Sequence, residues 1–302
     1  MKILIDRKNL ITKDSICGIG SFDGVHRGHQ GIVEYLKKSV GHKKRIGIIT
    51  FIPLPFFVLK SAPIIYLTLK KEKENVFKEL GVDFIYYFKF TKEFSRLTPS
   101  DFVKLVVTKI SPSTVVIGEN FHFGKGRKGS AKLLMQLALN NFSVHILPRV
   151  KEDGTISSTR IRELLLLGRI EAANKLLGRQ YTISGKVIKG KGKGKKLGFP
   201  TINIRVQKEK LIPLDGVYRV KVPMHNKEFL GAMFCHHNLL EIHLLNFSGN
   251  LYKKEVSIKL FKRIRNIRKF STAEALQRAI ARDIEVIRKG YQDIRITGHQ
   301  VK

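Results

Sequence analysis

Residues 18–36 read GIGSFDGVHRGHQGIVEYL and connect a predicted strand at residues 15–20 to a predicted helix at residues 29–40. The glycines of this stretch permit a tight turn between the two elements. His26 and His29 lie just before or within the first helical turn, where backbone N–H groups favour a phosphate. Two imidazoles three residues apart can meet the same anion, so the stretch predicts a strand, a phosphate-binding turn and a helix.

The same alternation of strand and helix continues outward from this stretch to about residue 150. The predicted strands are residues 15–20, 45–51, 82–90, 114–121 and 143–150. The predicted helices are residues 29–40, 71–80, 99–109 and 130–140, followed by two short ones at residues 158–167 and 170–177. This alternation is typical of a parallel α/β sheet, which binds its ligand beyond the carboxyl ends of the strands.

The pattern changes after Gly178 to short strands joined by turns. These predicted strands are residues 181–188, 201–206, 216–222, 229–235, 241–247 and 255–261. They indicate a compact all-β barrel. Ser271 and Glu274 form a predicted capping box, and apolar residues then recur at helical spacing, so we expect a C-terminal helix to cover the barrel. The predicted domains are residues 1–178 and 179–302.

Composition limits the class of protein and its partners. The chain has 302 residues and a formal net charge of +33, which attracts polyanions but is spread along the whole length without interleaved aromatics. Solvated lysine-rich faces therefore explain the charge better than a nucleic-acid interface. Cys17 and Cys235 lie in different halves, which argues for a reducing compartment. With no apolar stretch long enough to span a bilayer, we expect a cytoplasmic protein.

A second cluster, ISSTRIRELL at residues 156–165, places hydroxyls and guanidiniums where a loop becomes a helix. Hydroxyls cap helices and guanidiniums bind anions in a fork. Alone, the cluster is more simply an N-cap, and a histidine pair spaced like His26 and His29 is either structural or a metal pair. Together the two motifs favour a polyphosphate site, since no carboxylate or thiol of obvious ligand spacing accompanies the histidines.

These motifs carry a resemblance to a known family. Residues 22–29, FDGVHRGH, look like the His-x-Gly-His signature of nucleotidylyl transferases, and residues 157–162, SSTRIR, resemble their Ser-Ser-Thr-x-Ile-Arg motif. With residues 67–90 and 118–129, the chain is similar to bacterial bifunctional riboflavin kinase/FAD synthetase. The resemblance implies a Rossmann-like nucleotidylyl transferase domain in which His26 and His29 are catalytic. It implies ATP binding in this domain by Gly20, Phe22, Asp23, Gly24, Asn120, Ser157, Ser158, Thr159, Arg160 and Arg162.

In the β half, residues 185–204 read GKVIKGKGKGKKLGFPTINI and resemble the flavokinase motif of the same family. Glycines let backbone amides approach phosphates, lysines neutralise charge, and hydroxyl and amide oxygens suit Mg²⁺. Without the resemblance, a flexible basic loop and an ordinary strand would explain this stretch. The resemblance implies that Glu241 is the general base for the flavin 5′-hydroxyl. It implies nucleotide binding by Gly190, Gly192, Gly194 and Lys196, and Mg²⁺ binding by Thr201 and Asn203.

The chain also departs from the family pattern, mostly in the kinase half. Leu54 stands where the family usually has His, residues 231–241 contain neither the Asn-Ile-Gly nor the Pro-Thr segment, and Ile267 replaces an acid. We therefore expect weaker capture of riboflavin. The prediction is an enzyme that makes FMN from riboflavin and ATP, then FAD from FMN and ATP, with small-molecule partners. The alternatives are an FAD synthetase with a weak or degenerate kinase domain and a basic nucleic-acid-binding protein.

Overall fold

The structure is a computed structural model that describes residues 1–6, 15–39, 44–61, 63–148, 150, 155–190, 192–224 and 227–297, with side chains to residue 289. It divides into two compact units, Met1–Ser158 and Thr159–Lys302. The second unit thus includes residues 159–178, which the sequence analysis assigns to the first domain, and a functional boundary at 178 stays a prediction. Residues 40, 149 and 191, which belong to predicted segments, lie outside the described residues. No helix in the described ranges is long and apolar enough to cross a membrane.

The first unit is built on a six-stranded sheet in the order β1-β4-β3-β2-β5-β6, and every neighbouring pair is parallel. Its strands are β1 Lys2–Ile5, β2 Ser15–Ile19, β3 Arg45–Ile52, β4 Phe84–Lys89, β5 Thr114–Gly118 and β6 Ser143–Leu147. The predicted parallel sheet is confirmed. The four-residue edge strand β1 was not predicted, because so short a run shows no periodicity.

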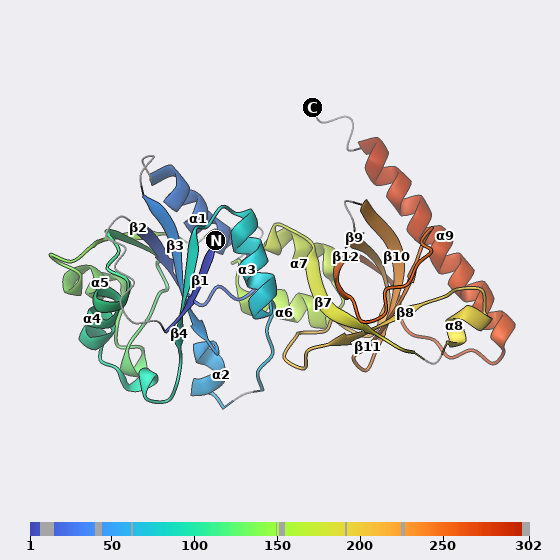
Figure 1. Cartoon of the computed structure of the whole chain (residues 1–302), viewed down its shortest axis with the longest axis horizontal. Coiled ribbons are helices and arrows are strands. Elements are labelled where there is room, and N and C mark those ends of the chain that lie inside the picture. Colours follow the sequence, from blue (N-terminus) through green and yellow to red (C-terminus); the bar gives the residue numbers. More distant parts are fainter. Residues whose placement is uncertain are drawn as a thin grey trace. The chain divides into compact units, whose positions relative to one another are not determined.

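Helices cover both faces of this sheet (Figure 1). They are α1 Arg27–Ser39, α2 Pro55–Leu59, α3 Lys70–Glu79, α4 Pro99–Lys109 and α5 Ala131–Leu137, with 3₁₀ turns at Phe94–Arg96 and Lys125–Arg127. Alternate β4 residues face opposite sides, so Tyr86 joins a core with Phe102 of α4, whereas Ile85 joins a core with Leu36 of α1 and Phe77 of α3. Both faces are therefore apolar, as a buried parallel sheet requires.

The strand order creates a switch point between β2 and β5. β2 lies between β3 and β5, so the connections that leave β2 and β5 diverge to opposite sides of the sheet. Ligands of such sheets bind at this switch point, outside the carboxyl ends of the strands. β5 ends at Gly118, and not at residue 121 as predicted, because the Phe121 N–H turns back to the Gly118 carbonyl.

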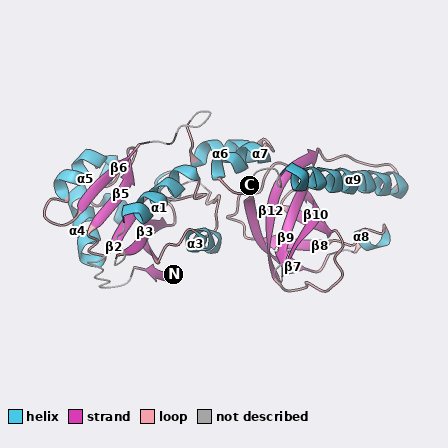
Figure 2. Ribbon diagram, turned by 90° about the horizontal axis from the view of Figure 1, so that it is seen from above, coloured by secondary structure: helices cyan, strands magenta, loops and turns pink. Residues whose placement is uncertain are grey.

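The second unit is a closed antiparallel barrel (Figure 2), which confirms the predicted all-β barrel, and its strands follow the order β10-β11-β8-β7-β12-β9. Its strands are β7 Tyr181–Ile188, β8 Ile202–Val206, β9 Gly216–Met224, β10 Lys227–His236, β11 Leu239–Leu244 and β12 Glu255–Arg265. Its helices are α6 Ser158–Leu166, α7 Ile170–Leu177, α8 Lys193–Lys196 and α9 Ala273–Thr297, of which α6 begins one residue before the unit.

Helix α9 packs on the barrel through Ile284 and Ile287, which cluster with Leu245. The predicted covering helix is therefore confirmed. The predicted capping box of Ser271 with Glu274 is wrong, because the Ala275 N–H donates to Thr272 Oγ1 and the helix begins one residue later than that box requires.

Candidate functional site

In the first unit, the loop between β2 and α1 is shaped by the carboxylate of Asp23. Asp23 is buried, and its Oδ1 accepts the N–H groups of Leu67 at 3.1 Å and Thr68 at 3.4 Å. The Gly24 N–H donates in turn to Thr68 Oγ1 at 3.1 Å, with Gly24 at a φ of 80° that glycine adopts readily. The side chain of Asp23, predicted to bind nucleotide, thus joins the loop to the segment before α3.

The two predicted catalytic histidines are brought together at the N-terminus of α1. The rings of His26 and His29 stack with centroids 3.6 Å apart and an interplanar angle of 15°. The His26 carbonyl accepts the N–H groups of His29 and Gln30, which begins the helix. The first turn of α1 contains no acidic residue. Phe22, predicted to bind nucleotide, is fully buried and supports His29 edge-on at 5.0 Å, while Gly20 leaves room for its ring.

The sequence analysis missed Lys73, a buried cation at this loop. Its Nζ donates to the Ser21 carbonyl at 3.0 Å, and Thr50 Oγ1 donates to the same carbonyl at 3.1 Å. Burial lowers the pKa of Lys73 to about 8, against the opposing effects of Asp23 and Glu74. The charged run KKEKEN around Lys73 resembles an exposed helix face, so no local pattern indicates that Lys73 is buried.

The ISSTRIR cluster reaches the same loop through Ser158, whose Oγ donates to the Asp23 carbonyl at 2.9 Å. Ser158 begins α6, and Arg160 and Arg162 follow it in the same helix. Ser157 is half-buried and Thr159 exposed. Asn120, exposed in the turn after β5, accepts a hydrogen bond from His122 Nδ1 through its carbonyl.

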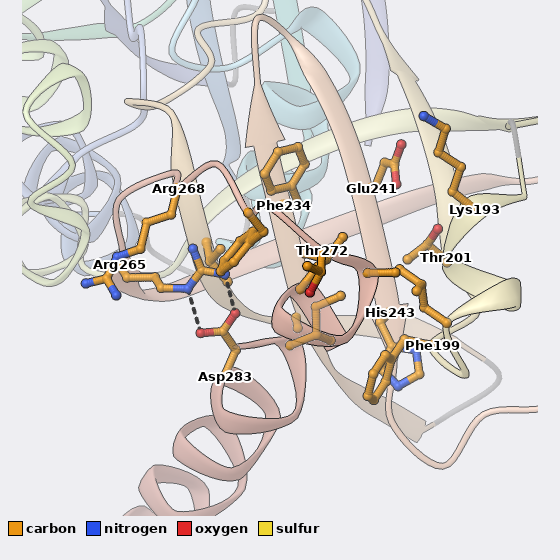
Figure 3. Close-up of a pocket in the computed structure, with 18 of the residues that line it drawn as sticks. Lys193, Phe199, Thr201, Phe234, Glu241, His243, Arg265, Arg268, Thr272 and Asp283 are labelled. Carbon is orange, nitrogen blue, oxygen red and sulfur yellow. Dashed lines mark hydrogen bonds and ion pairs between the residues drawn. The ribbon is translucent and has the colours of Figure 1, made fainter. Parts of the chain in front are cut away.

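The barrel contains a pocket of about 590 Å³ (Figure 3). Lys193, Thr201 and Glu241 lie on one side of it, and Arg265 and Asp283 lie on another. The apolar part of the wall includes Phe199 and Phe234. The pocket therefore combines a cationic and hydroxyl-bearing side with an apolar wall that can take a flat ring system.

The predicted glycines of this half leave room for the groups around the pocket. A Cβ on Gly190 would overlap the amide of Asn203, and a Cβ on Gly194 would overlap the Phe199 carbonyl. Gly192 has a φ of 70° in open space. Asn203 is the cross-strand partner of Glu241 in the β8–β11 ladder, which brings a predicted metal ligand beside the predicted base. Lys193 lines the pocket, whereas the predicted Lys196 lies exposed in the same turn of α8.

Two further groups of the pocket wall were not predicted. The Arg265 guanidinium makes a two-pronged ion pair with Asp283, with Nε–Oδ1 2.8 Å and Nη2–Oδ2 2.7 Å, which joins α9 to the end of β12. His243 Nδ1–H donates to the Pro200 carbonyl at 2.8 Å and packs edge-on against Phe199. Arg265 and Asp283 are 18 residues apart, so no local pattern connects them.

Two family models match the chain in succession. The model described as FAD synthetase matches residues 8–160, and the model described as riboflavin kinase matches residues 177–291. The first match holds the stacked histidines and the second holds the pocket, so each model covers one of the two sites.

Whole-chain comparisons agree with this division. Bifunctional riboflavin kinase/FMN adenylyltransferases from Buchnera aphidicola of Schizaphis graminum and from Listeria monocytogenes are 39% and 35% identical, covering 96% and 89% of this chain and 98% and 90% of their own. A crystal structure described as a macrolide-efflux protein from Streptococcus pneumoniae is 27% identical with a TM-score of 0.86, covering 95% of this chain and 99% of its own. The chain belongs to the bifunctional riboflavin kinase/FMN adenylyltransferase family.

Proposed function

We propose that the barrel transfers the γ-phosphoryl group of ATP to riboflavin, giving FMN, and that the first unit transfers the adenylyl group of a second ATP to FMN, giving FAD and pyrophosphate. The observation that carries the proposal is the presence of one site in each unit: the stacked histidines at the start of α1 and the barrel pocket with Glu241. The match of a different family model to each part of the chain supports the same division.

In the barrel, Glu241 accepts the proton of the riboflavin 5′-hydroxyl as its oxygen bonds to the γ-phosphorus and the bond to ADP breaks. Glu241 is half-buried at the pocket wall, where it is open to a bound hydroxyl. Lys193 lies on the same side and neutralises phosphate charge. The backbone at Gly192 lies in open space and can approach the phosphates closely, while Gly190 and Gly194 leave room for Asn203 and Phe199 beside it.

The donor set beside Glu241 suits Mg²⁺. Thr201 supplies a hydroxyl oxygen and Asn203 an amide oxygen, with the Asn203 amide packed over Gly190, and Glu241 is a carboxylate opposite Asn203. Thr201 and Asn203 would hold the ion. The ion would neutralise charge on the ATP phosphates during transfer.

In the first unit, the FMN phosphate oxygen attacks the α-phosphorus of ATP and the bond to pyrophosphate breaks. The nucleophile is already an anion, so the protein needs to position it and to stabilise charge on the leaving group. The N-terminus of α1 provides N–H groups, and His26 and His29 present two rings at the same place. Lys73 acts as a positioning residue, because its ammonium holds the Ser21 carbonyl of the loop.

The remaining expectations follow from this activity. The protein acts in the cytoplasm on riboflavin, FMN and ATP, and the boundary between the two activities lies near residue 178. The comparisons do not favour the two alternatives: the riboflavin kinase model matches the barrel over most of its length, and the named relatives are enzymes of flavin metabolism with both activities in their names.

Product analysis tests the proposal. Purified protein is incubated with riboflavin, ATP and Mg²⁺, and flavins are separated by chromatography over time. We expect FMN to form first and FAD to follow. Formation of FAD from added FMN, with no FMN from riboflavin, would refute the kinase assignment, and conversion of neither substrate would refute the whole proposal.

A further inference from the structure

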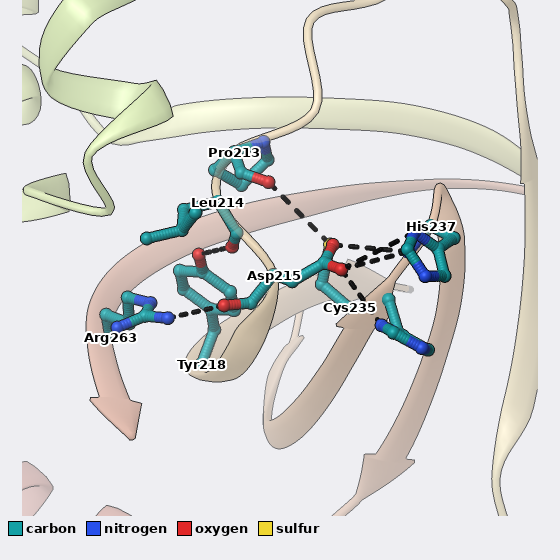
Figure 4. Close-up of polar contacts among 8 residues, drawn as sticks. Pro213, Leu214, Asp215, Tyr218, Cys235, His237 and Arg263 are labelled. Carbon is teal, nitrogen blue, oxygen red and sulfur yellow. Dashed lines mark hydrogen bonds and ion pairs between the residues drawn. The ribbon is translucent and has the colours of Figure 1, made fainter. Parts of the chain in front are cut away.

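Among the described residues, a group of polar side chains that does not line the barrel pocket lies at one end of the barrel (Figure 4). It consists of Asp215, His236 and His237. The β9–β10 ladder pairs Cys235 with Gly216, so Asp215 and His236 occupy the next cross-strand position. His237 follows in the turn before β11. The fold therefore brings together one carboxylate and two imidazoles from segments about 20 residues apart.

The distances suit a shared ion. Asp215 Oδ2 lies 2.9 Å from His236 Nδ1 and 3.9 Å from His237 Nδ1, and one ligand atom of each residue lies within 4.8 Å of the other two. Two ligands of a tetrahedral Zn²⁺, each about 2.0–2.1 Å from the ion, are about 3.3 Å apart. The two Asp215 distances bracket that separation, so small side-chain rotations suffice to meet it.

The segment that carries Asp215 is held in place by its surroundings. Three successive carbonyls of this segment accept hydrogen bonds. The Cys235 thiol donates to the Pro213 carbonyl and the Tyr218 hydroxyl donates to the Leu214 carbonyl. The Arg263 guanidinium donates to the carbonyl of Asp215 itself. Fixed backbone under a ligand lowers the cost of ordering the site.

We propose that Asp215, His236 and His237 bind a divalent transition-metal ion, with Zn²⁺ as the probe. Two imidazoles and one carboxylate are a donor set that Zn²⁺ accepts, and water completes the coordination. In the structure the His236 Nδ1–H donates to Asp215. When the ion binds at Nδ1, that proton leaves to solvent and the ring takes up a proton from solvent on Nε2, so the ring stays neutral as the other tautomer. The side chains are partly exposed, that of His237 by 83%, so the ion enters directly from solvent.

A purely structural role for the same residues makes a different prediction. Both Asp215 oxygens also accept the His237 backbone N–H, at 3.2 and 3.3 Å, which fixes the turn between β10 and β11. That contact needs the Asp215 carboxylate but not the imidazole of His237. His237→Gln therefore keeps the turn and removes one metal ligand, which separates the two roles.

The test is a competition titration of the metal-free full chain with Zn²⁺ against a chromophoric chelator. We expect the wild type to bind one more equivalent than the double variant His236→Gln/His237→Gln, and His237→Gln alone to bind that equivalent at least about tenfold more weakly. His145→Gln, which changes an exposed histidine of β6, is the matched control and should bind as the wild type does. Retained FMN formation shows that each variant is folded. Equal Zn²⁺ binding by the wild type and the double variant would overturn the proposal.

Discussion

Lys73→Met removes a buried positive charge that contacts the loop between β2 and α1. Lys73 is 3% exposed, and its ammonium donates to the Ser21 carbonyl. Methionine has a similar length and no charge, so it fills the same space. The Ser21 carbonyl keeps the hydrogen bond from Thr50 in the variant and is not left without a donor.

The expected effect on stability follows from the pKa of Lys73, which burial lowers from 10.5 to about 8. A change of that size makes the charged lysine about 3 kcal/mol less favourable in the folded chain than in the unfolded one. The variant also loses the hydrogen bond to Ser21, which offsets part of this gain. At pH 7 we therefore expect Lys73→Met to raise the free energy of unfolding by about 1 to 3 kcal/mol. Between pH 8 and 10.5 the unfolded wild-type chain binds more protons than the folded chain, because Lys73 is neutral only when it is buried. The wild type therefore becomes more stable as the pH rises through that window, and the difference in stability between it and Lys73→Met becomes smaller.

Each unit contains one cysteine, which allows its opening to be measured separately in the full chain. Cys17 lies in β2 and Cys235 in β10, and both are free and buried. Alkylation of each thiol under native conditions, followed by peptide mass analysis, reports how often its unit opens. We expect Cys17 in Lys73→Met to react about 5- to 150-fold more slowly than in the wild type at pH 7, with Cys235 unchanged.

The same variant should catalyse adenylyl transfer more slowly, because the loop that carries His26 is positioned less accurately. We expect kcat for FAD formation to fall by about tenfold to a hundredfold, with KM less affected and FMN formation unchanged. Lys78→Met, an exposed change on the same helix, is the control. Faster alkylation of Cys17 in Lys73→Met at pH 7, with activity falling in parallel, would refute the reasoning and leave Lys73 a merely structural residue.

Four other changes test the two sites. His29→Ala should lower FAD formation by about 100-fold or more and leave FMN formation intact, as measured by separate steady-state assays. Glu241→Gln should remove most riboflavin phosphorylation and spare FAD synthesis from FMN; an unchanged kinase rate would exclude the general-base role. Gly190→Ala should displace the Asn203 amide and lower kinase kcat while the barrel stays folded, as judged by Cys235 alkylation. Asp283→Asn should weaken the barrel by about 1 to 3 kcal/mol and speed Cys235 alkylation, with Cys17 as the unaffected reference.

The sequence predicted the two folds because their hydrophobic periods differ clearly. The parallel sheet and the closed barrel follow from runs whose spacing distinguishes strand from helix. The short elements β1 and α2 were not predicted, because four or five residues are too few to show a hydrophobic periodicity. Thr272 and Ser271 are both good caps, and only the position of the first helical hydrogen bond decides between them.

The sites were predicted only in part, for physical reasons. A motif contains residues that contact a ligand and residues that shape the loop, and the sequence does not separate them: Phe22 is buried, and the carboxylate of Asp23 binds backbone N–H groups. Lys73 could not be distinguished from the other charged residues around it, because its burial depends on how the helix packs against the sheet. The partnership of Arg265 with Asp283 depends on how α9 meets the barrel.

The most direct test of the account is the flavin profile of two complementary variants, alone and mixed. With riboflavin, ATP and Mg²⁺, His29→Ala alone should accumulate FMN, Glu241→Gln alone should leave riboflavin unchanged, and an equimolar mixture should produce FAD. This outcome requires that the two activities occupy separate sites, each complete in one variant. If the mixture made no FAD although both variants were folded, or if either change abolished both reactions, the assignment of one activity to each unit would be contradicted.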